Sequence, residues 1–268
     1  WSSDVCSSDL LFEEWGKKDP LANYENYLRE LGLLTDDLIS QYKNEFLTEI
    51  ESGLEATFAE EEVIPDLAEE MRDMYAPFEC PNDIDSGELP PASDRELRLV
   101  DAIKEGLEQS MERHEDLVIM GQDVAEYGGV FKITEGFVEK FGKGRVRNTP
   151  ITESSILGAG YGLSIAKQKA VVEMQFADFV TCGYNQIVNN LAKSHYRWGQ
   201  PANVVVRMPT GAGVQAGPFH SQSTEAWFYH VPGLKIYYPS TPADAKGLLM
   251  RAIEDPNPVL FFEHKLLY

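Results

Sequence analysis

Two kinds of hydrophobic pattern divide the chain. Between Pro20 and Ala76, apolar residues recur every three or four positions, which is typical of amphipathic helices. From residue 95 onward, short apolar runs alternate with helical patterns, and this alternation indicates a parallel sheet with helices on both faces. We therefore predict an α/β domain over residues 95–268, preceded by an acidic, all-helical segment over residues 11–80.

The helical segment is predicted to contain three helices in succession. The first ends at the C-capping glycine Gly32, and the second starts at the N-cap Thr35 and continues to Phe58. A short third helix is expected over residues 66–76. Residues 81–94 follow as a linker, because they are rich in Pro, Asp, Gly and Ser and show no hydrophobic period.

In the α/β domain, short apolar runs predict buried parallel strands, and longer runs with a period of three to four predict the helices between them. The expected strands cover residues 117–121, 145–148, 170–174, 204–208, 234–239 and 259–262. The expected helices cover residues 95–113, 134–141, 154–167, 179–197 and 242–254.

The first ten residues, WSSDVCSSDL, stand apart from the rest. They show neither a helical nor a strand period, and they lack the basic and long apolar regions of a signal peptide. They resemble translated adapter sequence of the kind that contaminates assembled reads; the alternative is a genuine disordered N-terminus. The chain also lacks an initiator Met and stops soon after a strand pattern, so we expect a fragment that is cut at both ends.

The negative charge is concentrated in the first third of the chain. The formal net charge is −21, and residues 1–90 hold 24 acidic and 5 basic residues, against 20 and 18 in residues 91–268. This acidity argues against binding to nucleic acid or to an anionic membrane, because both require a basic face. No apolar run approaches the roughly 18 residues of a membrane span. Three cysteines at no metal-binding spacing argue against a disulfide scaffold or a zinc cluster and suit a reducing compartment.

Glu153 is the first candidate for chemistry, because it lies where a predicted strand turns into a helix. Open α/β sheets bind ligands at the carboxyl ends of their strands, and this turn is such an end. The alternative is that Glu153 only interacts favourably with the helix dipole. Gly158, Gly160 and Gly162 fall inside the following helix, so close helix packing explains them better than a phosphate-binding loop, and no nucleotide-binding motif is present.

Two further candidates lie downstream. His220 follows a glycine-rich loop, and histidine can donate, accept or relay a proton near neutral pH. The alternative is a structural or incidental loop histidine. The aromatic residues within 173–190 have the spacing of a helix core, and Phe179 is the candidate among them for a wall against a planar ring.

Six separated blocks of the α/β domain carry a resemblance to a known family. The blocks are GQDVAEYGGVFKITEGFVEKFG, RVRNTPITESSILGAGYGLSIA, EMQFADFV, NQIVNNLAK, FHSQS and PADAKGLLMRAIEDPNPVLFFEHKLLY. In this order they resemble the β subunit of thiamine-diphosphate-dependent 2-oxo acid dehydrogenases, the decarboxylating first component of those complexes. The resemblance implies a transketolase-like, pyrimidine-binding domain over residues 95–268. Residues 11–77 resemble the C-terminal tail of the α subunit, which implies a fused α–β polypeptide joined at the linker.

The resemblance implies a role for each candidate residue. Glu153 matches a glutamate that contacts a ring nitrogen of the cofactor's aminopyrimidine, and Phe179 matches the ring that stacks on it. Gln175 and Ile151 match flanking contacts. His220 matches a histidine at the active-site mouth that handles substrate and the incoming lipoyl group. Catalysis is therefore expected from Glu153 and His220, and cofactor binding from the others together with Glu153.

The resemblance also implies two metal ions. Asp255 and Asn257, with Ala252 and the backbone near Val204, match a structural potassium site, although an Asp-Pro-Asn-Pro turn explains the same residues. The motif that holds magnesium and the diphosphate belongs to the α part and is expected upstream of this chain. Gln122 stands where the family usually has a glutamate, and the family's C-terminal β domain is expected to lie beyond this sequence.

These features lead us to expect oxidative decarboxylation of a 2-oxo acid, with acyl transfer to the lipoyl domain of an acyltransferase component. The blocks EMQFADF and FHSQS favour a branched-chain (2-oxoisovalerate) substrate. We expect a dimer or an α2β2-like assembly in the bacterial cytoplasm or the mitochondrial matrix, with the cytoplasm favoured. The alternatives are a pyruvate-specific member, transketolase-like carbon transfer and a non-catalytic dimerisation fragment.

Overall fold

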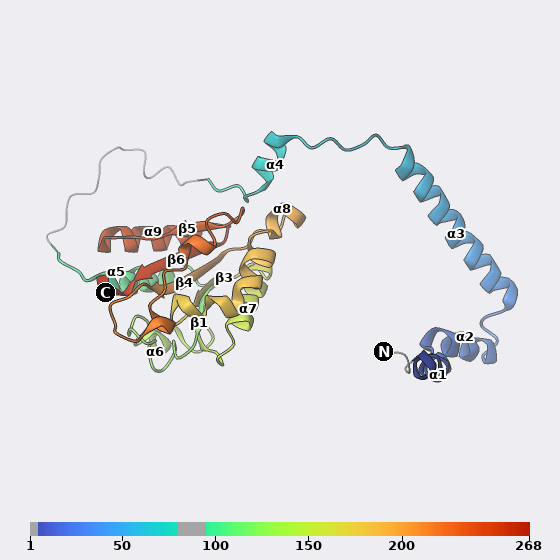
Figure 1. Ribbon diagram of the computed structural model, residues 1–268, viewed down its shortest axis with the longest axis horizontal. Helices are drawn as coiled ribbons and strands as arrows, with labels where there is room; N and C mark the ends of the chain where they lie inside the picture. The colour runs from blue at the N-terminus through green and yellow to red at the C-terminus, as the bar shows by residue number, and fades with distance from the viewer. Residues whose placement is uncertain (1–4, 80–94) are drawn as a thin grey trace. The chain divides into compact units, whose positions relative to one another are not determined.

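The computed structural model describes residues 5–79 and 95–268, with only the backbone for residues 5–10. The predicted linker over 81–94 lies outside the described residues. The chain divides into two compact units, Trp1–Ile64 and Pro65–Tyr268, and each is described by itself (Figure 1).

The described part of the first unit is formed by α1 (Val5–Gly16), α2 (Pro20–Glu30) and α3 (Asp36–Ala59). The predicted caps are confirmed. The Thr35 hydroxyl accepts a hydrogen bond from the backbone N–H of Leu38 at 3.2 Å, and Gly32 follows α2 with a φ of 68°. Contrary to expectation, α1 begins inside the first ten residues. The physical reason is that extending a helix backward from the residues after position 10 costs far less than starting one.

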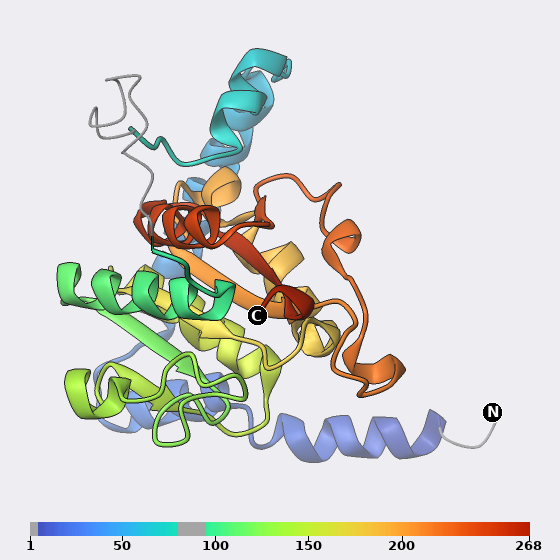
Figure 2. The same ribbon diagram turned by 90° about the vertical axis from the view of Figure 1, so that its left-hand side faces the viewer.

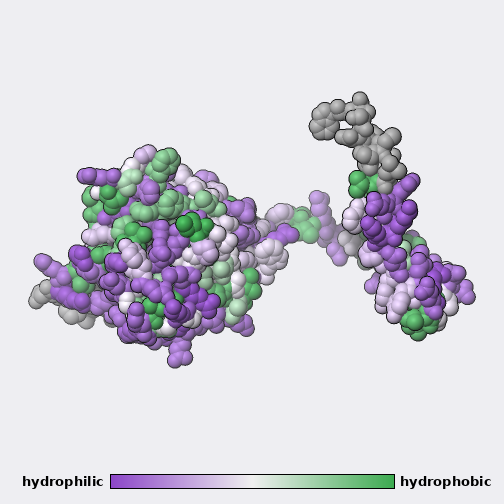
Figure 3. Space-filling view, turned by 90° about the horizontal axis from the view of Figure 1, so that it is seen from below, coloured by the Kyte–Doolittle hydropathy of each residue, from purple (hydrophilic) through white to green (hydrophobic). Residues whose placement is uncertain are grey.

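Helices α2 and α3 have no buried residue. Apolar side chains on α3, such as Tyr42, Phe46 and Ile50, are exposed and follow the four-residue spacing that predicted the helix. Hydrophobic and hydrophilic side chains are intermixed on the surface seen in Figure 3.

Among the helices of residues 5–79 and 95–268, none has the length and apolar character needed to cross a membrane.

The second unit is built on a sheet of six parallel strands, which confirms the predicted α/β fold. The strands are β1 (Leu117–Gly121), β2 (Val146–Asn148), β3 (Lys169–Glu173), β4 (Val204–Thr210), β5 (Lys235–Tyr237) and β6 (Val259–His264). Their order across the sheet is β2-β1-β3-β4-β6-β5, and every neighbouring pair is parallel. Each strand overlaps the apolar run that predicted it.

The strands send alternate side chains into two hydrophobic layers, one on each face of the sheet. Figure 2 shows helices on both faces of the sheet. Helices α5 (Leu99–Arg113) and α9 (Pro242–Glu254) share the first layer, and α7 (Glu153–Ile165) shares the second with residues 177–192. Strand residues in the first layer include Ile119, Val171 and Phe261, and those in the second include Val118, Val172 and Leu260. Burial on both faces explains why the strands read as continuous apolar runs.

The helix predicted over 179–197 is not one regular helix. The structure has instead a 3-10 helix Ala177–Gly183, a π-helical segment Gln186–Leu191 and α8 (Ser194–Trp198). A Cβ at Gly183 would lie 2.2 Å from Cδ1 of Leu157, so this segment packs closely on α7, and a larger residue there would force the Leu157 side chain to move. That close contact requires a local geometry that the hydrophobic period does not reveal.

Two other helices start later than predicted. Helix α6 (Phe137–Phe141) follows Gly136, whose φ of 85° lies outside the helical region. Helix α5 starts at Leu99, and Arg98 before it pairs with Asp101 of the first turn at 2.7 Å. The predicted ranges had extended both helices into the preceding loops.

Residues 65–79 belong to the second unit, although their helical pattern groups them with the segment before the linker. Helix α4 (Leu67–Asp73) begins this stretch. Asn257 then accepts a hydrogen bond from the backbone N–H of Ala76 at 2.7 Å and donates one to its carbonyl at 3.0 Å. The Tyr75 hydroxyl donates to the carbonyl of Leu234 at 3.3 Å. Asn257 and Leu234 precede β6 and β5, so the segment is attached at the amino-terminal edge of the sheet.

Candidate active site

The carboxyl ends of the parallel strands lie at one edge of the sheet, and the predicted catalytic residues follow these ends. Glu153 comes after β2, Phe179 after β3 and His220 after β4. Gln122, which stands where the resembling family usually has a glutamate, directly follows β1. Parallel strands therefore bring residues that are far apart in sequence to a common edge.

Glu153 is the first residue of α7, and only 8% of it is exposed. The chain reaches it from β2 through Thr149, whose backbone N–H donates to the carbonyl of Gly121 at 2.9 Å. The side-chain amide of Gln122, itself buried, donates a hydrogen bond to Oε1 of Glu153 at 3.1 Å. A carboxylate is thus held out of water at a helix N-terminus, where the helix dipole favours negative charge.

The glycines of α7 do not form a phosphate-binding loop. A Cβ at Gly160 would lie 2.8 Å from Cγ1 of Val172 and 3.4 Å from Cγ1 of Val204, so the helix rests directly on β3 and β4. This confirms the packing interpretation for Gly160. At Gly162 an added Cβ would meet nothing within 4 Å, so packing does not explain that glycine.

Phe176, Phe179 and His220 form an aromatic group at the edge. The ring centroids are 4.8 Å apart for Phe176 and His220, 5.4 Å for Phe179 and His220, and 5.8 Å for the two phenylalanines, all edge to face. Nδ1 of His220 is buried and has no hydrogen-bond partner among the described residues. The sequence singled out Phe179 and His220 separately, and the structure places them in contact.

The remaining predicted cofactor residues differ in their surroundings. Gln175 donates from Nε2 to Oδ2 of Asp123 at 3.4 Å, which links the end of β3 to the turn after β1. Ile151 lies in the loop before Glu153 and is 80% exposed. Its side chain is therefore free to contact a ligand or another chain, but it packs little against its own.

The loop that carries His220 is held against the residues after β3. Oδ1 of Asp178 accepts a hydrogen bond from the backbone N–H of Gln222 at 3.1 Å. At the start of the loop, Gly211 has a φ of 80°, and a Cβ there would lie 2.3 Å from Nε2 of His264. Glycine is thus required on both conformational and steric grounds. These contacts fix the two ends of the loop around His220.

Lys265 places a buried cation beside the aromatic group. Only 5% of it is exposed, and its Nζ has no hydrogen-bond partner among the described residues and lies 5.3 Å from the Phe176 ring centroid. Burial lowers the pKa of Lys265, and the nearby carboxylate of Asp178 acts in the opposite direction. Neither residue stands out in the sequence as a candidate for the site. The sequence feature that could have identified them is their position close to strand ends. Charged residues are seldom buried unless they have a partner or a function.

A buried ion-pair network joins the carboxyl ends of β3 and β6 to the middle of β4. Arg207 is fully buried and donates to Glu263 through two nitrogens and to Glu173 through the third, each at 2.7 Å. The Tyr268 hydroxyl donates to Glu263 at 2.5 Å. Burial raises the pKa of Glu173, and the charge of Glu263 adds to this effect while Arg207 opposes it. The sequence feature that could have pointed to this ion-pair network is an arginine inside the apolar run VVVRM.

The residues predicted to bind potassium lie at the opposite, amino-terminal edge. Oδ1 of Asp255 accepts hydrogen bonds from the backbone and side chain of Asn257 at 2.9 and 2.8 Å, and Oδ2 pairs with Lys235 at 2.5 Å. These side chains fit a turn that docks residues 73–78 better than a potassium cage, because the Lys235 ammonium already neutralises the carboxylate. Ala252 and Val204 offer only backbone carbonyls. No group of three or more His, Cys, Asp or Glu in the described part of the chain is arranged to hold a metal ion.

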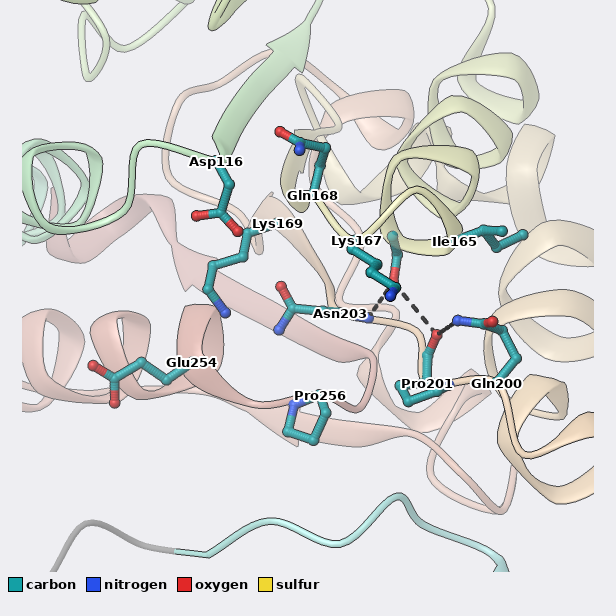
Figure 4. A pocket seen from close by; sticks show the side chains of 11 residues that line it. Asp116, Ile165, Lys167, Gln168, Lys169, Gln200, Pro201, Asn203, Glu254 and Pro256 are labelled. Atoms are coloured by element: carbon teal, nitrogen blue, oxygen red, sulfur yellow. Dashed lines mark hydrogen bonds between the residues drawn. The ribbon is translucent and has the colours of Figure 1, made fainter.

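A surface hollow of about 340 Å³ also lies at the amino-terminal edge (Figure 4). Asp116 before β1, Lys169 at the start of β3 and Asn203 before β4 line it. The Ser164 hydroxyl accepts from the backbone N–H of Asn203 at 2.7 Å and donates to the carbonyl of Pro201 at 3.4 Å. This hollow is at the far edge from Glu153 and does not belong to the candidate site.

Known proteins are similar in sequence to residues 95–268 of this chain. Residues 95–268 match the family model described as transketolase, pyrimidine binding domain. The 2-oxoisovalerate dehydrogenase subunit beta of Bacillus subtilis (strain 168) is 49% identical over 176 residues, covering 64% of this chain and 53% of that protein. The pyruvate dehydrogenase E1 component subunit beta of Rhizobium meliloti (strain 1021) is 42% identical over 170 residues, covering 63% of this chain and 37% of that protein.

A solved structure also shares the fold. It is described as a split gene transketolase, inactive beta4 tetramer, and it aligns with a TM-score of 0.51 at 21% identity over 62% of this chain and 50% of its own. The chain spans about half the length of the curated relatives it matches. Because the family model covers the whole sheet domain, the chain belongs to the transketolase pyrimidine-binding domain family, and its relatives there are β subunits of 2-oxo acid dehydrogenases.

Proposed function

We propose that this chain supplies the pyrimidine half of a thiamine diphosphate site in the first component of a 2-oxo acid dehydrogenase complex. The observation that carries the proposal is the buried carboxylate of Glu153, held by Gln122 at the same sheet edge as the contact between Phe179 and His220. The β-subunit relatives support the reaction class. When bound, the cofactor accepts the electrons left on the substrate as carbon dioxide departs.

The residues of this chain would act around that cofactor in three ways. Glu153 shares a proton with a nitrogen of the aminopyrimidine ring, and its burial keeps water from competing for that proton. Phe179 offers a ring for stacking, flanked by Gln175 and Ile151. His220, in contact with Phe179 at this edge, would exchange a proton with substrate or with the lipoyl group.

The other half of the site is proposed to come from the α-type part of a fused α–β polypeptide. That part would hold magnesium and the diphosphate. The partners in this proposal are the lipoyl domain of an acyltransferase component and a second copy of the chain, in a dimer or an α2β2-like assembly. Potassium stays a prediction for the backbone carbonyls near Val204 and Ala252.

For the substrate we propose a branched-chain 2-oxo acid. The identity of 49% to the Bacillus subtilis 2-oxoisovalerate subunit, against 42% to the Rhizobium meliloti pyruvate subunit, supports this choice. One or two methylenes in a pocket are worth about 1–3 kcal/mol, so few residues decide the preference. The check is the ratio of kcat/KM for 2-oxoisovalerate and pyruvate. A ratio of roughly ten or more is expected, and a ratio below one would make pyruvate the substrate.

The test of the proposed function is Glu153→Gln in the assembled enzyme. The fold and most of the cofactor affinity should be retained, because the diphosphate and magnesium supply the main anchoring charges. Decarboxylation should fall by several orders of magnitude, because an amide cannot share a proton with the ring nitrogen as a carboxyl group does. Glu139→Gln, at an exposed glutamate of α6, is the matched control. Wild-type turnover of the Glu153 variant with cofactor bound would contradict the proposal.

A further inference from the structure

We infer that Gln122 is a positioning residue that fixes the carboxylate of Glu153 through one oxygen and leaves the other free for the cofactor. This inference rests on the proposed function, since it concerns how Glu153 meets the aminopyrimidine. It is carried by a single contact between two buried polar side chains, in which Gln122 Nε2 lies 3.1 Å from Glu153 Oε1.

The contact leaves the two carboxylate oxygens in different situations. Within the described residues, Gln122 is the hydrogen-bond partner of the Glu153 side chain, and it bonds Oε1 alone. An ionised carboxylate only accepts hydrogen bonds, so a fixed donor on one oxygen restricts the rotation of the group. Oε2 is then the oxygen that can share a proton with a ligand.

Gln122 can fix another side chain because its own backbone is closely constrained. A Cβ at Gly121 would lie 3.0 Å from Cγ1 of Val124 and 3.1 Å from Cβ of Glu173, so β1 ends in tight contact with β3. The carbonyl of Gly121 accepts from the N–H of Thr149, which ties the end of β2 to the same point. Asp123 then turns the chain with a φ of 58°. A rigid base of this kind is what a positioning side chain requires.

The choice of an amide at position 122 has a chemical consequence. A glutamine donates a hydrogen bond at every pH, whereas a carboxyl group at the same place donates only while it is protonated. Two carboxylates in contact cannot both be ionised at low cost, so they share a proton. The other charged groups packed here are Asp123, next along the chain, and Glu173, which Arg207 holds in an ion pair. The substitutions Gln122→Met and Gln122→Glu leave Asp123, Glu173 and Arg207 unchanged.

The first test is Gln122→Met, which keeps the side-chain length and removes the donor. In the enzyme assembled with thiamine diphosphate and magnesium, cofactor affinity by calorimetry should stay close to wild type. The unfolding temperature should fall by only a few degrees, because one buried carboxylate oxygen loses its donor. The circular-dichroism band of the imino tautomer of the bound cofactor should weaken, and decarboxylation with ferricyanide should fall roughly ten- to a hundredfold, as expected for a misplaced catalytic group. The matched control is Gln41→Met, which removes an exposed Gln–Glu bond of 2.8 Å on α3.

The outcomes separate this inference from the function on which it rests. If Gln122→Met has the wild-type dichroism band and turnover while Glu153→Gln loses both, Gln122 has no positioning role and the proposed function stands. If turnover falls only in proportion to cofactor affinity and unfolding temperature, the role is structural and the inference is wrong. If Glu153→Gln itself behaves as wild type, the proposed function fails.

A second variant, Gln122→Glu, preserves the shape in case the methionine variant does not fold. Its turnover should approach wild type at the acidic end of the accessible range, where the two carboxyl groups share a proton. Turnover should then fall more steeply than wild type as pH rises and that proton is lost. A pH profile that overlays the wild-type profile would overturn the inference.

Discussion

Replacing Asn257 with Ala should detach residues 73–78 from the sheet domain. Asn257 is 98% buried, with 2% of its surface exposed. It receives a hydrogen bond from the N–H of Ala76 at 2.7 Å and donates to the carbonyl of Ala76 at 3.0 Å and to Oδ1 of Asp255 at 2.8 Å. The substitution removes all three bonds and leaves the buried backbone groups of Ala76 without a partner.

The magnitude follows from these contacts. A protein hydrogen bond contributes about 0.5–1.5 kcal/mol net, and a buried group left unsatisfied costs about 1–3 kcal/mol. The segment can relax by moving into water, so the loss should lie near 2–5 kcal/mol, well below the sum of all the separate penalties. Each 1.4 kcal/mol is a factor of ten in an equilibrium, so the detached state should become roughly 30-fold more populated or more.

The assay combines urea denaturation with limited trypsin digestion at Arg72, which is exposed at the end of α4. Asn257→Ala should lower the free energy of unfolding and accelerate cleavage after Arg72. Asn44→Ala, at an exposed position on α3, is the control and should do neither. A change below about 0.5 kcal/mol with unchanged cleavage would refute the docking role. A stabilisation by potassium over sodium that disappears in Asn257→Ala would instead support the cation site implied by the family.

Three further predictions concern the carboxyl edge. Asp178→Ala should free the loop held through Gln222 and speed its proteolysis, whereas Asp178→Asn keeps an acceptor oxygen and should behave closer to wild type; equal proteolysis in the two would contradict this. His220→Ala should lower the lipoyl-coupled reaction by about 100- to 10,000-fold and ferricyanide-coupled decarboxylation much less, so equal losses would assign the residue to substrate or cofactor binding. Burial raises the pKa of Glu173, so its contribution to stability is present below the ordinary value of 4.5 and is lost as pH rises through the raised pKa. Glu173→Gln should flatten this part of the curve of unfolding free energy against pH, and an unchanged slope would show that Glu173 does not titrate there.

The strands and the sheet-covering helices could be predicted because the local hydrophobic pattern of each segment determines them. Each strand is a short run buried on both faces, as in LVIMG and VLFF, so its apolar composition is visible without knowledge of the neighbours. The helical path over 177–198 could not be predicted, because the close approach of Gly183 to Leu157 depends on how two segments pack. The attachment of residues 65–79 depends likewise on Asn257, which is far away in sequence.

Part of the candidate site could also be predicted from local features of the sequence. Glu153 and His220 stand out by residue type and by position after strands, and the structure places both at the expected edge. Their partners are set by tertiary contacts. Gln122 reaches Glu153 only because β1 and β2 are neighbours in the sheet, and Phe176 reaches His220 only through the folding back of the glycine-rich loop. Residue patterns therefore indicated the chemistry, while the orientation of each group came from the fold.

The central claim is that Glu153 meets the aminopyrimidine of thiamine diphosphate. The most direct test is the distance between the Glu153 carboxylate and the ring nitrogen in a structure of the assembled enzyme with cofactor bound. We predict a hydrogen bond of about 2.6–3.2 Å from Oε2, with Oε1 still bonded to Gln122 and the Phe179 ring against the pyrimidine. A pyrimidine ring bound away from this edge, or one that contacts no carboxylate of this chain, would contradict the claim.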